Sequence, residues 1–210
     1  VTVQEVEAGN FEGRSDWIPT GNGAHCVKTD LSNKYVMLPH IAGEHGMNAI
    51  RLFRFDDDNG SLVPNRPAEI SQPDNRGPRH YVFHPNGRYV YFSNEQDCSV
   101  TAYSFDSTSG LIKELQTEST LPMHYGGVNS CAQLRITPDG RYLFAPNRGH
   151  NSLAGFSVDS DSGGLTQIGR TPTEAIPRVL DIDSTVKYLY SAGLESGHVS
   201  AFNISGDGSL

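Results

Sequence analysis

The 210-residue chain lacks an excess of basic residues. Its 16 lysines and arginines stand against 24 aspartates and glutamates, so the formal net charge is −8. A protein that binds nucleic acid through the phosphates needs a basic face, so we expect no nucleic-acid partner. The chain also lacks an apolar run near the roughly 20 residues of a membrane span, and no basic-then-apolar leader opens it. We therefore expect a soluble protein without a membrane partner.

Cysteine is scarce as well. Cys26, Cys98 and Cys131 are an odd number and lack C-x-x-C spacing, which argues against a disulfide framework and against a zinc knuckle. We expect buried, reduced thiols, with a free nucleophilic cysteine as the alternative. No segment shows a sustained helical period. The apolar fraction of 36% together with 22 glycines is nevertheless typical of a folded globular domain.

What the sequence does contain is a fourfold internal repeat. Each unit has a short apolar stretch, a turn, a basic residue followed by tyrosine, two more apolar stretches and a polar turn with glycine. The tyrosines are Tyr35, Tyr89, Tyr142 and Tyr188, spaced by 54, 53 and 46 residues. Three or four strand-like runs per unit and a period near 50 are typical of β-propeller blades. A plain β-sandwich would not explain why the same tyrosine recurs four times.

The repeat therefore predicts an all-β protein, a β-propeller of four-stranded blades with about four blades present. We expect one domain over residues 1–210, with blades at roughly 23–70, 77–121, 130–172 and 177–210 and with residues 1–8 as the outer strand of a preceding blade. A propeller removes its exposed edges by closing the ring. Four blades then indicate an internal piece of a longer propeller or an open arc that needs a partner.

The repeat also predicts a rim on which unusual residues gather. Because the first two strands of each unit form a hairpin, the start of the first strand and the end of the second lie at one end of the sheet. The residues expected there are His25, His40, Arg79, Asn94, Glu95, Asn147, Arg148, Arg178 and Glu195. Guanidinium groups bind carboxylate or phosphate through paired hydrogen bonds, so we expect a small anionic ligand at this rim.

Two patterns that resemble metal sites have simpler explanations. The stretch from Asp56 to Gly60 looks like the start of a calcium loop, but no glutamate closes it at the twelfth position, so a hairpin turn is favoured. His80 and His84 share one face of a predicted strand, yet no third ligand has metal-site spacing. We expect no metal and no cofactor.

At the rim residues the sequence resembles the seven-bladed propeller lactonases typified by bacterial 6-phosphogluconolactonase. The resemblance rests on Gly77-Pro78-Arg79-His80 leading to Ser93-Asn94-Glu95, on Asn147-Arg148-Gly149-His150 and on Pro177-Arg178. It runs from about residue 23 to residue 210 and implies that four of seven blades are present. It also implies a cytoplasmic enzyme of the pentose phosphate pathway. Arg135 stands where many relatives carry histidine.

The same family includes fungal carboxymuconate lactonising enzymes, whose proposed active site uses a histidine, two arginines and a glutamate. By motif these correspond to His25, Arg79, Arg148 and Glu95. The resemblance thus implies hydrolysis of a sugar lactone, most specifically 6-phosphogluconolactone, with Glu95 as general base, His25 as proton donor to the leaving alkoxide and Arg148 at the oxyanion or phosphate. The expected substrate-binding residues are Arg79, His80, Asn94, Asn147 and Arg178. The alternatives are cyclisation of a carboxymuconate, or a non-catalytic propeller that binds a peptide or glycan on the same rim.

Overall fold

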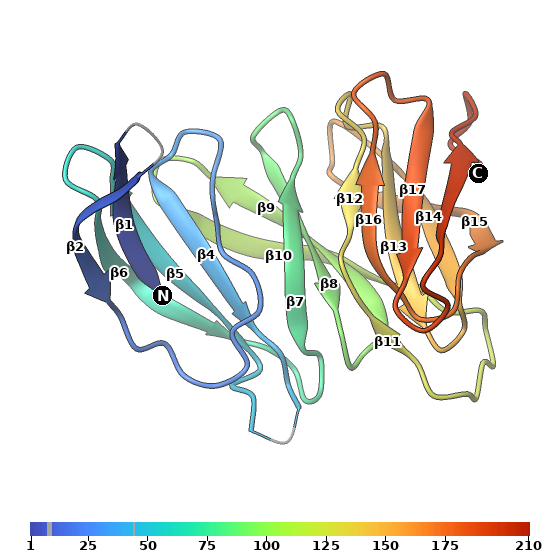
Figure 1. Cartoon of the computed structure of the whole chain (residues 1–210), viewed down its shortest axis with the longest axis horizontal. Coiled ribbons are helices and arrows are strands. Elements are labelled where there is room, and N and C mark those ends of the chain that lie inside the picture. The colour runs from blue at the N-terminus through green and yellow to red at the C-terminus, as the bar shows by residue number, and fades with distance from the viewer. Residues whose placement is uncertain (8–9, 44) are drawn as a thin grey trace.

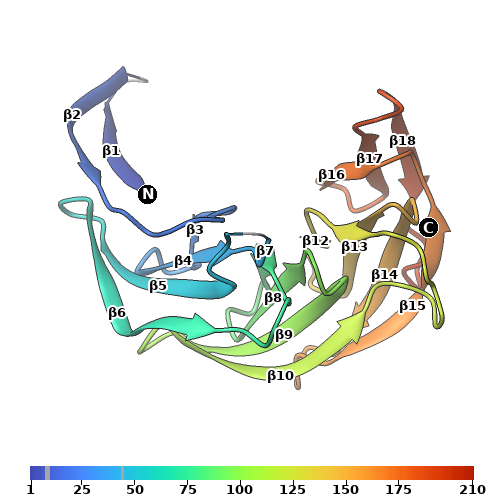
Figure 2. The same cartoon turned by 90° about the horizontal axis from the view of Figure 1, so that it is seen from below.

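The computed structural model describes residues 1–7, 10–43 and 45–210, which form antiparallel β-sheets arranged as an arc (Figure 2). The chain begins with a two-stranded hairpin of β1 (Thr2–Glu7) and β2 (Asn10–Trp17) at one end of the arc. Four larger sheets follow in chain order, and we call them blades 1 to 4. Within the described residues there is no helix long and apolar enough to span a bilayer.

Each blade is a sheet whose neighbouring strands follow one another in the chain. Blade 1 contains β3 (Lys28–Thr29), β4 (Tyr35–His40), β5 (Ala49–Asp56) and β6 (Ser61–Ser71). Blade 2 contains β7 (Pro78–Phe83), β8 (Tyr89–Asn94), β9 (Ser99–Asp106) and β10 (Leu111–Ser119). Blade 3 contains β11 (Ser130–Cys131), β12 (Arg135–Ile136), β13 (Tyr142–Arg148), β14 (Ser152–Val158) and β15 (Leu165–Pro172). Blade 4 contains β16 (Pro177–Ile182), β17 (Tyr188–Gly193) and β18 (Val199–Asn203).

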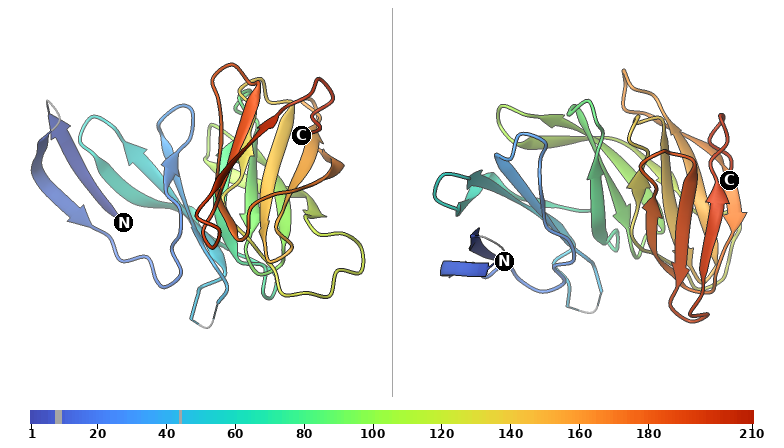
Figure 3. Two further views of the ribbon diagram at one scale, coloured as in Figure 1. Left: turned by 45° about the vertical axis from the view of Figure 1, so that its right-hand side comes forward. Right: turned by 45° about the horizontal axis from the view of Figure 1, so that its top comes forward.

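The predicted all-β fold of about four propeller blades is confirmed. The first strands of the blades, β3, β7, β12 and β16, line the concave side of the arc, and β6, β10 and β15 lie on its outside (Figure 2). The chain forms two paired strands, over residues 2–7 and 10–17, where the sequence analysis expected one outer strand over residues 1–8; residue 8 lies outside the described residues. The two further views in Figure 3 show this hairpin and blade 4 at opposite ends of the arc.

Proline interrupts the first strand of blades 1 and 3. Pro39 and Pro146 each lie four residues after the repeated tyrosine, on the strand that pairs with the inner one. Proline has no N–H to give to the ladder, so pairing there is incomplete. The carbonyl of Pro39 accepts a hydrogen bond from the amide of His25 at 3.1 Å, and β3 is only two residues long. Ser93 occupies the same position in blade 2, where the inner strand runs unbroken over six residues.

In blades 1 to 3 the repeated tyrosine joins its blade to the next one. The hydroxyl of Tyr35 donates to the backbone carbonyl of Thr108, and that of Tyr142 donates to the carbonyl of Gly206, each at 2.6 Å. Both acceptors lie in the turn that follows the third strand of the next blade. Tyr89 makes the same bond to the turn of blade 3. The turn glycine packs against the tyrosine ring, and a Cβ atom at Gly110, Gly163 or Gly208 would overlap that ring. This contact explains why tyrosine and glycine recur together in the sequence.

Candidate active site

The strand pairing brings the predicted charged residues to one end of the blades. Ser130 at the start of β11 pairs with Arg148 at the end of β13, and Pro78 pairs with Asn94. Glu95 follows β8 directly, and Arg178 is the second residue of β16. This end of the first strands is the lower edge in Figure 1, and we call it the charged rim. The opposite end, with turns at residues 30–34, 84–88, 137–141 and 183–187, is the turn rim.

Glu95 lies between two arginines at the centre of the site. Its Oε2 is bound by Nε of Arg79, and its Oε1 lies 3.1 Å from an Nη atom of Arg148. All three side chains are largely buried, with exposed fractions of 16% for Glu95, 2% for Arg79 and 11% for Arg148. Arg148 belongs to blade 3 and the other two to blade 2, so the ion pair between Arg148 and Glu95 crosses the blade interface.

Hydrogen bonds with main-chain groups hold both Glu95 and Arg148 in position. The amide of Glu95 donates to the carbonyl of Gly77 at 2.6 Å, and the carbonyl of Glu95 accepts from the amide of Cys131 at 3.1 Å. The carbonyl of Cys131 in turn accepts from Arg148 at 2.8 Å. The sequence analysis missed this part of the site, because a main-chain carbonyl leaves no signal in residue type.

His25 and His80 lie beside the arginines, with ring centroids 5.3 Å apart. An Nη atom of Arg79 is 2.7 Å from Nδ1 of His80. A guanidinium group can only donate, so Nδ1 of His80 accepts and its ring is neutral. Burial and, next, the charge of Arg79 lower the pKa of His80 to about 3. The same two causes lower the pKa of His25 below its usual value of 6.5, so His25 is also neutral at neutral pH.

Arg178 adds an exposed cation to this group from blade 4. Its charge is among the causes that lower the pKa of both His25 and Arg79. Within the part of the chain that the structure describes, Arg178 makes no ion pair. Its guanidinium is therefore available to a ligand, whereas those of Arg79 and Arg148 are already engaged with Glu95.

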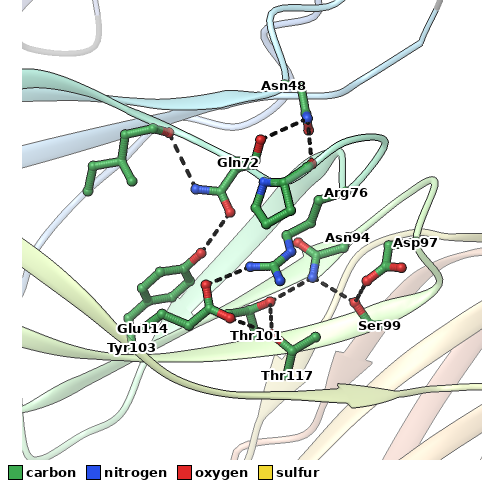
Figure 4. Close-up of polar contacts among 12 residues, drawn as sticks. Asn48, Gln72, Arg76, Asn94, Asp97, Ser99, Thr101, Tyr103, Glu114 and Thr117 are labelled. Carbon is green, nitrogen blue, oxygen red and sulfur yellow. Dashed lines mark hydrogen bonds and ion pairs between the residues drawn. The ribbon is translucent and has the colours of Figure 1, made fainter.

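Asn94 and Asn147 lie elsewhere, because their side chains point into the blades. They are 1% and 0% exposed. Nδ2 of Asn94 donates to Ser99 and Thr101, both at 2.8 Å, and Figure 4 shows these contacts among other polar contacts of blade 2 and of Asn48 and Gln72 from blade 1. Asn147 exchanges hydrogen bonds with Thr120 in the same way. Neighbouring side chains on a strand face opposite ways, so an asparagine next to Glu95 or Arg148 does not share its surface. We assign both amides a structural role.

His40, at the equivalent position of blade 1, is 0% exposed and bonds the carbonyl of Leu38 at 3.1 Å. It is therefore also absent from the exposed surface of the charged rim. No group of three histidine, cysteine, aspartate or glutamate side chains among the described residues has the geometry of a metal site.

The comparisons with known proteins concern the family and the fold. Residues 3–210 match the family described as lactonase, 7-bladed β-propeller. The chain belongs to this lactonase family. The sequence resemblance to propeller lactonases is thus confirmed, and the four blades described are part of a seven-bladed architecture.

Solved structures show the same fold. The periplasmic gluconolactonase of Pseudomonas aeruginosa aligns with a TM-score of 0.88 at 23% identity, over 99% of this chain and 60% of that one. Candidate 6-phosphogluconolactonases from Bacteroides uniformis and Bacteroides fragilis align with TM-scores of 0.88 and 0.84, at 24% and 23% identity. All of this chain and 62% of each of those chains are covered. This lactonase-family chain therefore spans about three-fifths of the length of these relatives.

Proposed function

We propose that this lactonase-family protein hydrolyses a phosphorylated sugar lactone, 6-phosphogluconolactone, to 6-phosphogluconate. The observation that carries the proposal is the carboxylate of Glu95 held between Arg79 and Arg148, with neutral His25 and exposed Arg178 beside it. One carboxylate among three guanidinium groups leaves an excess of positive charge for an anionic substrate. Preorganised cations of this kind also stabilise the oxyanion that forms when a lactone carbonyl is attacked.

The geometry changes one role that the sequence analysis assigned. Glu95 already accepts a hydrogen bond from Arg79 and forms an ion pair with Arg148, so both of its oxygens are engaged, and we propose that it positions the arginines. Neutral His25 is the better general base, because an imidazole with a lowered pKa is free to accept a proton at neutral pH.

The reaction then runs in two steps. Water attacks the lactone carbonyl carbon while its proton passes to His25, and the arginines stabilise the resulting oxyanion. The tetrahedral intermediate collapses with cleavage of the bond between the carbonyl carbon and the ring oxygen. The protonated His25 returns its proton to that oxygen, which becomes a hydroxyl group, and the neutral ring is restored.

Turnover assays with the full chain test this proposal. We expect hydrolysis of 6-phosphogluconolactone, and we expect Glu95→Gln and Arg148→Ala each to lower kcat/KM by about 100-fold or more. Arg54→Ala is the matched control, since Arg54 is an exposed arginine on β5 away from the charged rim. Wild-type rates in both rim variants would refute the assignment. Cyclisation of a carboxymuconate in place of lactone hydrolysis would favour the other chemistry of the family.

A further inference from the structure

We infer that the protein has a second anion-binding position, formed by Lys28 of β3 and Arg135 of β12, on the concave side of the arc between the charged rim and the turn rim. The inference rests on the proposed function, because this position would hold the phosphate while the lactone ring lies at Glu95 and His25. Neither residue belongs to the motifs that point to the rim, and neither contacts Glu95 in the structure.

Strand pairing places the two cations at one level of the propeller. Lys28 pairs with the residue two positions after the repeated tyrosine of its blade, and Arg135 does the same in blade 3. Asp181 of β16 is at this level in blade 4. Glu95 and Arg148 come six positions after their tyrosines. The two levels are therefore four residues apart, roughly 13 Å along a strand.

His80 lies on β7, the inner strand of the blade between the two cations. After burial, the charges of Arg79, His25, Lys28 and Arg135 all act to lower its pKa. The charges of Lys28 and Arg135 also act to lower the pKa of the half-buried Cys26, beside β3, against burial, which raises it. Inner strands of three successive blades thus direct positive charge toward one region around His80.

Both cations are available to a ligand. Lys28 is exposed, and its amine makes a 3.4 Å hydrogen bond to the neutral carbonyl of Tyr81. No carboxylate pairs with it among the residues that the structure describes. Arg135 pairs with Asp181 at 3.2 Å, but the side chain of Asp181 is 74% exposed. An ion pair this open contributes at most about 1 kcal/mol, so a phosphate with two charges can replace it.

The charge of the concave side supports a ligand with two separated anionic groups. The ionised side chains placed at the two levels above are those of Lys28, Arg79, Glu95, Arg135, Arg148, Arg178 and Asp181, which are five cations and two carboxylates. The chain as a whole is acidic, with a net charge of −8. Concentrated like charge disfavours the folded state unless a ligand neutralises it. The rim arginines are sufficient for the oxyanion of the lactone ring, so the level of Lys28 and Arg135 suits a second anionic group.

The spacing suits a phosphosugar. The amine of Lys28 bonds the carbonyl of Tyr81, which pairs with Phe92, so it lies about three residues, roughly 10 Å along a strand, from the level of Glu95. The remaining span is comparable to the length of a six-carbon lactone with a phosphate at the far end. This level would therefore select phosphorylated over unphosphorylated lactones.

Binding of the reaction product tests the inference without any need for turnover. Calorimetry at low salt would compare 6-phosphogluconate with gluconate in the wild-type full chain and in Lys28→Ala and Arg135→Ala. We expect both variants to bind 6-phosphogluconate at least tenfold more weakly, with less than a threefold change for gluconate. Lys187→Ala, which removes an exposed lysine of the turn rim, is the matched control and should behave as the wild type. Lys28→Arg and Arg135→Lys should restore part of the affinity.

Equal losses for both ligands, unchanged affinity in both variants, or no binding of 6-phosphogluconate to the wild type would each overturn the inference. The outcomes separate it from the proposed function. A wild type that hydrolyses neither lactone, yet binds 6-phosphogluconate through Lys28 and Arg135, removes the proposed reaction and keeps the anion position. A wild type that hydrolyses 6-phosphogluconolactone, with both variants unaffected, keeps the reaction and removes the anion position.

Discussion

The two ends of the blades satisfy their carboxylates in different ways. On the turn rim, Asp30 accepts hydrogen bonds from the backbone amides of Lys34 and Tyr35, both at 2.8 Å. Asp183 does the same in blade 4, with the amide of Tyr188 at 2.7 Å. On the charged rim, Glu95 is bound by guanidinium groups from two blades. Local, neutral donors thus close the turn rim, whereas long-range ion pairs hold the charged rim together.

The pKa values show what this difference means. A hydrogen bond from Thr185 and backbone amides lower the pKa of the Asp183 carboxyl to about 2, so the turn stabilises its ionised form. On the charged rim, burial and neighbouring cations instead lower the pKa of His25 and His80. The turn rim therefore favours the ionised form of its carboxyl groups, whereas the charged rim favours the neutral form of its imidazoles. We therefore expect substitutions on the turn rim to change stability and substitutions on the charged rim to change activity.

The largest contrast should come from two histidines, one on each rim. His25→Gln should lower kcat/KM for lactone hydrolysis by about 100-fold or more, because it removes the proposed general base. His84→Gln should leave kcat/KM within threefold. His84 is 4% exposed and accepts a hydrogen bond from the amide of Asn86 at 3.1 Å, so its loss should lower the free energy of unfolding by about 1–2 kcal/mol.

Turnover assays and chemical denaturation of the same samples check both effects. The contrast between the rims is wrong if His25→Gln loses stability and keeps its activity, or if His84→Gln is inactive while folded.

The sequence predicted the fold and the gathering of the rim because both follow from the repeat. Hairpin pairing alone brings Arg79, Glu95 and Arg148 to one end. It did not predict where each side chain points, since that depends on irregular pairing. The ladder of β7 and β8 shifts register between Pro78 and His80, so Arg79 lies in a bulge. A bulge redirects the side chains next to it, and no residue type in this stretch announces it.

The structure differs from the expectation for the two asparagines for a related reason. Asn94 precedes Glu95 and Asn147 precedes Arg148, and sequence proximity suggested a shared surface. Both asparagines are still inside their strands and face the interior, where Thr101 and Thr120 bind them. The sequence analysis did not single out Lys28 and Arg135 as a pair, because they lie on different blades and only the strand register places them at one level.

Two turn glycines sharpen the contrast in stability. Gly163 lies in an outer turn at the turn rim with φ +74°, and a Cβ atom there would overlap the ring of Tyr89. Gly197 lies at the charged rim with φ +67°, and a Cβ atom there would meet nothing within 4 Å. Gly163→Ala should lower the free energy of unfolding by about 2–4 kcal/mol, from backbone strain and overpacking. Gly197→Ala should lower it by about 1–2 kcal/mol, from strain alone.

Urea denaturation of the two variants measures the difference, which isolates the packing of Tyr89 on the next blade. Equal losses would mean that the tyrosine contact contributes nothing beyond the backbone. Neither glycine lies at Glu95, so kcat/KM should stay near the wild-type value in both.

The smallest effect concerns the pH dependence of stability on the charged rim. His80 has a pKa of about 3 in the folded protein, against 6.5 when exposed. As pH falls below 6.5, the unfolded chain gains a proton at this ring and the folded protein does not, so the free energy of unfolding falls. Between pH 6.5 and pH 5.5 this amounts to about 1 kcal/mol. His80→Asn should remove that part of the slope, as measured by urea denaturation at several pH values. His198→Asn, which removes a side chain that is 77% exposed, serves as the control. If His80→Asn and the wild type lose stability in parallel over this range, the ring of His80 is protonated in the folded state. It could not then accept the hydrogen bond from Arg79.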